Sequence, residues 1–174
     1  MAVKHYHDCN VLEAARDRIR LVFKHFDRVC VAFSGGKDSS VTLHLALEVA
    51  REMGRGPVHA LFIDLEGQYQ ATIAHVTEMF DRPDVRPWWI CLPINLRNAS
   101  SLREPYWCAW EPGREADWVR ALPSHPAVIS DPACFPFYRH RMEFEEFFPA
   151  FNAWLAQDAS TAFLVGVRSD ESLN

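Results

Sequence analysis

The sequence predicts an α/β fold with a doubly wound, mostly parallel sheet. Short apolar runs rich in β-branched and aromatic residues alternate with segments of helical periodicity. This strand–helix–strand–helix–strand order favours parallel strands that are joined by right-handed crossovers. The first apolar run is followed, after one serine, by a pair of glycines, which marks the end of a buried strand. The length of 174 residues suits a single domain, which we expect to span residues 1–174.

The first predicted element is a helix within residues 1–27. Asn10, with Glu13 three residues later, is a typical N-cap pair. Apolar residues then recur at the spacing of a helix that buries one face. These apolar positions are Leu12, Ala15, Ile19, Val22, Phe23 and Phe26.

Two strand–helix units follow. The run VCVAF (29–33) predicts a buried strand, and the helix after it carries one apolar stripe and ends near Gly54. The run VHALFI (58–63) predicts a second buried strand, which is again followed by a helix. The stripe of the first helix consists of Val41, Leu45, Val49 and Met53, and that of the second of Tyr69, Ile73, Val76 and Phe80.

Two further strands complete the predicted sheet. PWWICL (87–92) is the third, with Pro87 at its start because proline cannot donate a ladder hydrogen bond, and TAFLVGV (161–167) is the fourth. We expect the order 3-2-1-4 across the sheet. Residues 93–160 interrupt the rhythm and are rich in proline and tryptophan. We expect them to form an insertion that covers part of the sheet or a substrate pocket, with a helix kinked at Pro149.

The composition excludes some classes of function. The formal charge of −5 argues against a dedicated binder of duplex DNA. No stretch is long and apolar enough to span a bilayer, and the N-terminus lacks the apolar core of a secretion signal. The five cysteines are scattered without a C-x-x-C pair, which is typical of a reducing compartment. We therefore expect a cytoplasmic protein that contacts neither membrane nor duplex DNA.

The segment SGGKDSS (34–40), between the first strand and its helix, carries the most polar chemistry. Gly35 and Gly36 allow a sharp turn whose amides point into one concavity. The positive end of the helix dipole points to the same place, which favours an anion there. Side chains add further donors, namely the hydroxyls of Ser34, Ser39 and Ser40 and the ammonium group of Lys37.

The spacing excludes two common phosphate loops. The segment has neither the G-x-x-x-x-G-K-[ST] spacing of the Walker A loop nor the G-x-G-x-x-G pattern of dinucleotide-binding turns. A plain glycine turn with a serine cap would not explain Lys37, nor hydroxyls on both sides of the glycines. The pattern therefore predicts a cradle for phosphate or pyrophosphate. Within it, Asp38 either caps the helix or approaches a hydrated Mg²⁺ ion.

A strand followed by SGGKDSS closely resembles the PP-loop of the adenine nucleotide α-hydrolase-like superfamily. That superfamily includes N-type ATP pyrophosphatases, tRNA thiolation enzymes and phosphoadenosine phosphosulfate (PAPS) reductases. A second stretch, GVRSDES (166–172), resembles the G-[ILV]-R-x-x-E-S stretch of PAPS reductase relatives. Together with DLEGQY, CLP and LRN, it makes the chain similar to the immunoglobulin-binding-regulator-A type of that family, which is often labelled a PAPS sulfotransferase. The resemblance covers most of residues 25–174.

The predicted topology brings these two polar stretches together. In an open sheet of this order, ligands bind beyond the carboxyl ends of the strands at the switch point, so the loops after the first and fourth strands face one crevice. Arg168 can fork onto a phosphate or sulfate oxygen, Glu171 can hold Arg168 or a metal, and Ser172 can donate a hydrogen bond. We expect Lys37, Asp38 and Arg168 to be catalytic. The expected phosphate site consists of Ser34, Gly35, Gly36, Ser39, Ser40, Gly166, Arg168, Glu171 and Ser172.

The resemblance also implies an adenine site around the first two strands. Main-chain groups there would recognise the base, which Ala32, Phe33, Phe62 and Ile63 would line. Asp64 and Glu66 have two interpretations. They are a carboxylate pair that supports the site on its Mg²⁺ side, or Asp64 caps the next helix. The metal expected at Asp38 is Mg²⁺.

By resemblance, ATP would be split at its α-phosphate to give an adenylated acceptor and pyrophosphate. The cradle, Lys37 and Mg²⁺ would stabilise the charge on the departing pyrophosphate. The first alternative is a PAPS-binding reductase or sulfotransferase. PAPS reductases carry a cysteine in a C-terminal E-C-G-[IL]-H tail, which this sequence lacks, so reduction by a thiol is disfavoured. The second alternative is a non-catalytic, nucleotide-sensing regulator that acts with a ParB-like protein partner.

The sequence stops at ESLN, directly after the second motif. No closing helix follows that motif. We therefore expect either a natural short form or a fragment that lacks a C-terminal part.

Overall fold

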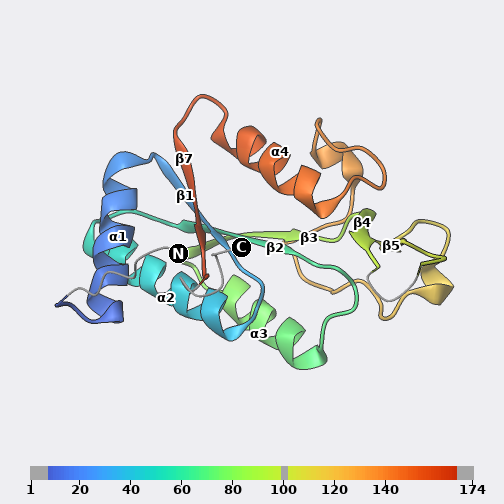
Figure 1. Ribbon diagram of the computed structural model, residues 1–174, viewed down its shortest axis with the longest axis horizontal. Coiled ribbons are helices and arrows are strands. Elements are labelled where there is room, and N and C mark those ends of the chain that lie inside the picture. Colours follow the sequence, from blue (N-terminus) through green and yellow to red (C-terminus); the bar gives the residue numbers. More distant parts are fainter. Residues whose placement is uncertain (1–7, 99–101, 168–174) are drawn as a thin grey trace.

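A five-stranded parallel sheet forms the centre of the computed structural model, which describes residues 8–98 and 102–167 (Figure 1). The strand order is β6-β3-β2-β1-β7, and every neighbouring pair is parallel. The predicted order 3-2-1-4 is confirmed, because it corresponds to β3-β2-β1-β7. The insertion adds β6, a short edge strand that the sequence did not predict. The strands are β1 (Arg28–Ala32), β2 (Val58–Ile63), β3 (Val85–Ile90), β6 (Val128–Ile129) and β7 (Thr161–Val165).

Helices cover both faces of this sheet. On one face lie α1 (Val11–His25), α2 (Lys37–Glu52) and α3 (Gln70–Phe80), and on the other lies α4 (Phe144–Ala156) (Figure 1). Alternate strand residues pack into two separate apolar clusters, as the two-residue period of a strand requires. In β1, Val29 and Val31 join the cluster under α1, α2 and α3, whereas Cys30 joins the cluster under α4.

The predicted start of the first helix is confirmed. Asn10 is the N-cap of α1, and its side chain accepts from the Glu13 amide while the Glu13 carboxylate accepts from the Asn10 amide. The basic face of α1 is attached to α2 by two ion pairs, Arg16 with Glu48 at 2.8 Å and Arg20 with Glu52 at 2.9 Å.

Two predicted helix faces were wrong in part. In α2, Val41 is 54% exposed and Met53 is 38% exposed. Val49 of the predicted stripe is fully buried and Leu45 packs against the core, but most of the buried face is a neighbouring stripe with spacing i, i+3, i+4, i+7, made of Leu43, Ala46, Leu47 and Ala50. Its small and aliphatic side chains let the helix approach the strands. In α3, Tyr69 is the N-cap residue and is 84% exposed, so it lies outside the buried face.

The third strand begins earlier than predicted. β3 starts at Val85, so Pro87 lies inside the strand, opposite Ala60 of β2. The amides of Trp89 and Cys91 donate to residues 127 and 129, on the β6 side of β3. The nitrogen of Pro87 faces the same side, but β6 pairs only with Trp89 and Ile90. Among the described strands, none therefore needs a hydrogen bond from Pro87, which is why proline is tolerated there.

The remaining elements belong to the insertion. They are a β4 (Ile94–Arg97) and β5 (Tyr106–Ala109) antiparallel pair and two 3₁₀ turns, Glu115–Asp117 and Pro132–Cys134. Pro149 lies inside α4, the helix predicted for this segment. All five cysteines are free thiols. Among the described residues, no helix has the length and apolar character needed to cross a membrane.

Candidate functional site

The β1–α2 turn, residues 34–40, needs glycine at its second position. Gly35 has a φ of +71°, and a Cβ atom there would lie 2.7 Å from Cγ2 of Thr72 and 3.0 Å from Cγ2 of Val76. Any side chain at this position would therefore be strained by its backbone conformation and would collide with α3. Gly35 lets the chain turn sharply while α3 packs directly against the turn.

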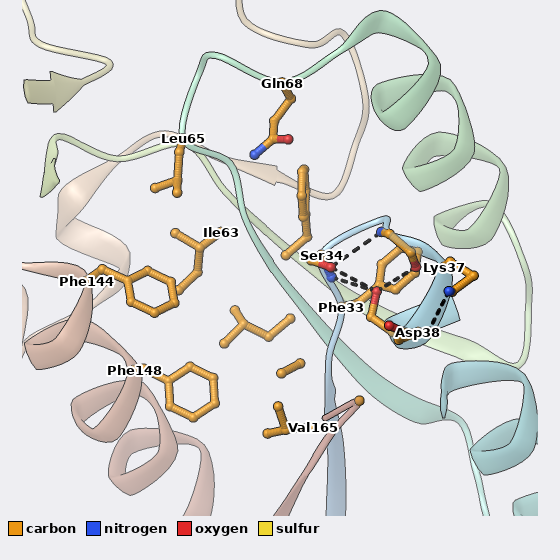
Figure 2. A pocket seen from close by; sticks show the side chains of 16 residues that line it. Phe33, Ser34, Lys37, Asp38, Ile63, Leu65, Gln68, Phe144, Phe148 and Val165 are labelled. Carbon is orange, nitrogen blue, oxygen red and sulfur yellow. Dashed lines mark hydrogen bonds and ion pairs between the residues drawn. The ribbon is translucent and has the colours of Figure 1, made fainter. Parts of the chain in front are cut away.

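Three serine hydroxyls hold the β1–α2 turn together from within, and Figure 2 shows Ser34 among the contacts of this turn. Oγ of Ser39 accepts from the Ser34 amide at 3.2 Å, lies 3.0 Å from Oγ of Ser34, and donates to the Gly36 carbonyl at 3.0 Å. Oγ of Ser40 donates to the same carbonyl at 2.8 Å and lies 2.8 Å from Nε2 of His75. Ser39 is only 7% exposed. The hydroxyls expected to bind phosphate thus also fix the shape of the turn.

The first turn of α2 faces the cavity beyond this corner. Gly36 is the N-cap residue and carries no side chain, so no side-chain cap covers the helix end. The first amides of a helix have no carbonyl partner within the helix. Residues 36–39 line the cavity, so these amides and the helix dipole are available to an anion there.

The cavity itself has a volume of about 440 Å³ and combines a polar end with an apolar end (Figure 2). This volume lies within the range typical of sites for small molecules and cofactors. The polar end is formed by Ser34, Gly36, Lys37, Asp38 and Ser39, and the rest of the wall by Ala32, Phe33, Leu61, Phe62, Ile63, Leu65, Gln68, Phe144, Phe148, Val165 and Gly166.

The four residues expected to line an adenine ring all border the cavity. Two of them have their side chains on the cavity side of the sheet, and the other two have their side chains on the opposite side. Leu61 and Ile63 pack in the cluster under α4, on the cavity side of the sheet. Phe33 and Phe62 belong to the opposite cluster, where the Phe33 ring packs on His75 and Phe80. Phe33 and Phe62 therefore face the cavity through their main chain, and only Ala32 and Ile63 of the predicted four lie on its side of the sheet.

Gly166 brings the end of β7 beside α2. A Cβ atom at Gly166 would lie 2.8 Å from both the Asp38 carbonyl oxygen and Oγ1 of Thr42, so only glycine fits this approach. Gly166 thus borders the same cavity as the β1–α2 turn. Arg168, Glu171 and Ser172 lie outside the described residues.

Lys37 and Asp38 are the charged groups at the polar end of the cavity. Nζ of Lys37 lies 3.5 Å from Oδ1 of Asp38, and the two side chains are 80% and 41% exposed. Within residues 8–98 and 102–167, no group of three histidine, cysteine or acidic side chains is arranged to hold a metal ion. Mg²⁺ commonly uses one or two carboxylates together with substrate phosphates, so a single exposed Asp38 fits an ion that arrives with a nucleotide.

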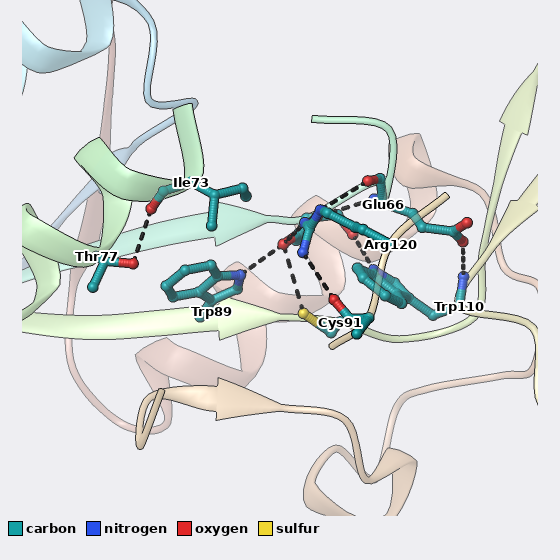
Figure 3. A network of polar contacts seen from close by, with 9 residues as sticks. Glu66, Ile73, Thr77, Trp89, Cys91, Trp110 and Arg120 are labelled. Atoms are coloured by element: carbon teal, nitrogen blue, oxygen red, sulfur yellow. Dashed lines mark hydrogen bonds and ion pairs between the residues drawn. The ribbon is translucent and has the colours of Figure 1, made fainter. Parts of the chain in front are cut away.

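Asp64 follows β2, but its side chain is buried and does not line the cavity. Figure 3 shows the polar network around it, with Trp89, Cys91 and Arg120. Its carboxylate accepts from Nε1 of Trp89 at 2.8 Å and from the Glu66 amide at 3.0 Å, and it pairs with the guanidinium of Arg120. Burial, with the nearby Asp64 charge, raises the pKa of the Cys91 thiol. The helix-cap interpretation of Asp64 was wrong, because Tyr69 is the N-cap of α3.

Glu66 has all four of its polar groups bonded. Its amide donates to Asp64 and its carbonyl oxygen accepts from Nε of Arg120 at 3.0 Å. Its carboxylate accepts from the amides of Trp110 at 2.8 Å and Val119 at 2.6 Å. Glu66 is 2% exposed and has a φ of +66°. That conformation costs about 1–3 kcal/mol for a residue with a side chain, and these contacts offset the cost.

Several lining residues were not predicted from the sequence. Leu61 could have been found, because it shares a strand face with Ile63. Phe144 and Phe148 are four residues apart on one helix face, but only the tertiary structure places that face over the sheet. Leu65 and Gln68 lie in the turn after β2, and no pattern in the sequence singles them out.

Comparisons with known proteins agree with this geometry. Residues 28–93 match the model of the phosphoadenosine phosphosulfate reductase domain. The chain is 42% identical over 168 residues to the uncharacterized protein YbdN of Escherichia coli (strain K12). This match covers 95% of the chain and 40% of that protein.

Sulfate adenylyltransferase subunit 2 proteins match a shorter stretch. The protein of Mycobacterium bovis (strain BCG / Pasteur 1173P2) is 41% identical over 68 residues, which are 39% of this chain and 22% of that protein. The protein of Mycolicibacterium vanbaalenii is 38% identical over a stretch of the same length. The chain thus spans well under half the length of each relative. The matched core, residues 28–93, contains β1, the glycine turn, α2, β2, α3 and β3. The match to the phosphoadenosine phosphosulfate reductase domain thus covers the part of this chain that contains three of the five sheet strands and the glycine turn.

Proposed function

We propose that this protein binds an adenine nucleotide in the cavity at the end of β1 and splits Mg²⁺-ATP at its α-phosphate. One observation carries the proposal: a single cavity joins the amide-rich start of α2 to an apolar compartment under α4. The polar end suits the phosphates, because free amides and the helix dipole favour an anion. The apolar end suits the base, with Ala32, Leu61 and Ile63 on the sheet and Phe148 on α4.

The proposed reaction is adenylyl transfer to an acceptor oxygen. An acceptor lone pair forms a bond to the α-phosphorus, and the bond from that phosphorus to the bridging oxygen breaks. The electron pair of that bond leaves with pyrophosphate, and the acceptor carries AMP. The name of the sulfate adenylyltransferase relatives describes a transfer of this kind, with sulfate as the acceptor.

Lys37 and Asp38 have complementary roles in this proposal. The two side chains pair with each other at 3.5 Å. With Mg²⁺-ATP, Lys37 would turn to the phosphate oxygens and stabilise the charge that develops on pyrophosphate. Asp38 would then help to hold Mg²⁺, which supplies charge stabilisation at the phosphates when it is bound. Arg168, beyond Gly166, stays a predicted catalytic residue.

A second candidate is binding of PAPS for sulfonate transfer. The family match to the phosphoadenosine phosphosulfate reductase domain favours it. The same cavity would take the adenosine of PAPS under α4, with its phosphosulfate at the start of α2. The two candidates differ in the anion at the polar end, so they can be separated by ligand.

The test is a calorimetric titration of the protein with ATP, AMP and PAPS, with and without Mg²⁺, followed by an assay for released pyrophosphate. Lys37→Met is the test variant, and Lys24→Met, which changes an exposed lysine at the end of α1, is the matched control. We expect Lys37→Met to weaken ATP binding more than tenfold, which corresponds to the loss of about 1.4 kcal/mol or more. The control should bind as the wild type does.

Each outcome has a clear meaning. Tight binding of Mg²⁺-ATP with pyrophosphate release supports adenylyl transfer. Binding of PAPS without binding of ATP supports the second candidate. Absence of binding for all three nucleotides contradicts both.

A further inference from the structure

We infer that Arg120, from the insertion, is a positioning residue for nucleotide binding because it fixes the β2–α3 turn (residues 64–68) in the shape that walls the cavity. The inference rests on the proposed function, since it concerns the same nucleotide site. Arg120 does not line the cavity. It acts through the turn.

The β2–α3 turn has one side toward the cavity and one side toward the insertion. Leu65 and Gln68 line the cavity, and Figure 2 shows both at its edge. Between them, Glu66 extends away from the cavity and accepts hydrogen bonds from the insertion amides of Trp110 and Val119. Contacts on the insertion side therefore decide where the cavity wall lies.

Arg120 contacts the β2–α3 turn at two residues, Asp64 and Glu66, and Figure 3 shows Arg120 beside Glu66. Nη2 pairs with the carboxylate of Asp64, and Nε donates to the carbonyl of Glu66 at 3.0 Å. Its guanidinium also lies 5.0 Å from the centre of the Trp110 ring, over its face. The planar guanidinium of Arg120 thus joins Asp64, at the end of β2, to Glu66, which lies two positions later and has a φ of +66°.

The geometry separates two tasks of Arg120. The first is to neutralise a fully buried carboxylate, which any cation of sufficient reach could do. The second is to hold the Glu66 carbonyl with a second donor of fixed orientation, which lysine cannot do because its ammonium is a single point. If the β2–α3 turn adopted the shape that walls the cavity in only a tenth of the molecules, the apparent Kd for the nucleotide would be tenfold higher.

The test compares Arg120→Lys with the wild type in thermal unfolding, nucleotide titration and hydrogen exchange of the ligand-free protein. Arg139→Lys is the matched control, because Arg139 is 71% exposed and pairs with Glu146 away from the turn. We expect Arg120→Lys to keep a cooperative unfolding transition. We also expect its Kd for Mg²⁺-ATP to rise about tenfold and amide exchange to accelerate at residues 65–68 but not in β2.

A second variant protects the test against loss of folding. Arg120→Met with Asp64→Asn removes both charges and leaves an oxygen that can accept from Trp89. We expect it to unfold at a higher temperature than Arg120→Met alone, while its Kd stays about tenfold above the wild type. If affinity instead recovers together with stability, Arg120 has only a structural role and the inference is overturned.

The failure of this inference differs from the failure of the proposed function. If the wild type binds no adenine nucleotide, the proposed function fails, and exchange at residues 65–68 still shows whether Arg120 positions the turn. Unchanged exchange and unchanged Kd in Arg120→Lys overturn the inference while nucleotide binding by the wild type stands.

Discussion

The β1–α2 turn and the β2–α3 turn lie at the ends of neighbouring strands of one sheet, yet different kinds of contact hold them. In the first, Ser34, Gly36 and Ser39 bond to residues at most five positions away, and Ser40 adds one longer contact, to His75 of α3. In the second, Asp64 and Glu66 bond to Trp110, Val119 and Arg120, which lie 44 to 56 positions away. The comparison shows that one wall of a cavity can be encoded locally while the adjacent wall depends on a distant segment.

The largest effect should come from the long-range turn. Asp64→Ala leaves Arg120, the Trp89 indole and the Glu66 amide without their shared acceptor, so we expect the free energy of unfolding to fall by about 3–5 kcal/mol. Urea denaturation measures this loss. Asp38→Ala is the matched control in the local turn. The carboxylate of Asp38 is partly exposed and pairs with an exposed lysine, so we expect a change within about 0.5 kcal/mol. Equal losses would remove the distinction between the turns.

A smaller but clear effect is expected from Gly35→Ala. The added methyl meets Thr72 and Val76 of α3, and the backbone has positive φ, so we expect a loss of about 2–4 kcal/mol in unfolding free energy. Gly113→Ala separates the two causes, because Gly113 has a φ of +78° but open space around its Cβ position. We expect about 1 kcal/mol for it from the backbone alone. A similar loss in both variants, measured by urea denaturation, would show that α3 does not restrict the local turn.

Acid should destabilise the protein through His59 in β2, a residue outside both turns. Nδ1 of His59 accepts from the Trp88 indole at 2.9 Å, and burial, with the charges of Arg86 and Arg28, lowers the pKa of His59 to about 4. The unfolded chain therefore binds a proton that the folded chain excludes. The contribution is complete above pH 6.5, the ordinary pKa of histidine, and is lost as the pH falls from there to about 4.

We expect a loss on the order of 2 kcal/mol between pH 7 and pH 4.5, measured by urea denaturation. His59→Asn keeps an acceptor near the Nδ1 position and does not titrate, so its stability should change less over this range. A variant with the same acid sensitivity as the wild type would assign that sensitivity to other groups.

The smallest effect should come from Ser39→Ala in the local turn. It removes the hydroxyl that links Ser34 to the Gly36 carbonyl, and we expect a loss of about 1 kcal/mol in unfolding free energy. Hydrogen exchange should accelerate at residues 34–40 and stay unchanged at residues 64–68. Faster exchange at both turns would show that they are coupled and would contradict the comparison.

The sequence allowed the fold and the phosphate end of the site to be predicted, because both depend on short-range patterns. Apolar runs at strand spacing gave the order of β3, β2, β1 and β7, and the heptapeptide SGGKDSS located the cavity. The start of β3 was predicted wrongly and the buried face of α2 was predicted wrongly in part, because each depends on a neighbouring element. β6 pairs with β3 only at Trp89 and Ile90, so Pro87 can lie inside the strand, and packing against the sheet decides which apolar residues of α2 are buried.

The sequence by itself determined the β1–α2 turn. Its glycines permit the sharp turn, and the hydroxyls of Ser34, Ser39 and Ser40 bond mostly to groups within residues 34–40. What only the tertiary structure decided is the rest of the cavity. The sequence did not show that Phe144 and Phe148 would cover it, that the Phe33 ring would lie on the opposite face, or that Asp64 would pair with Arg120. The physical reason is range. Contacts within one turn depend on neighbouring residues alone, whereas contacts across some fifty residues exist only once the insertion has packed against the sheet.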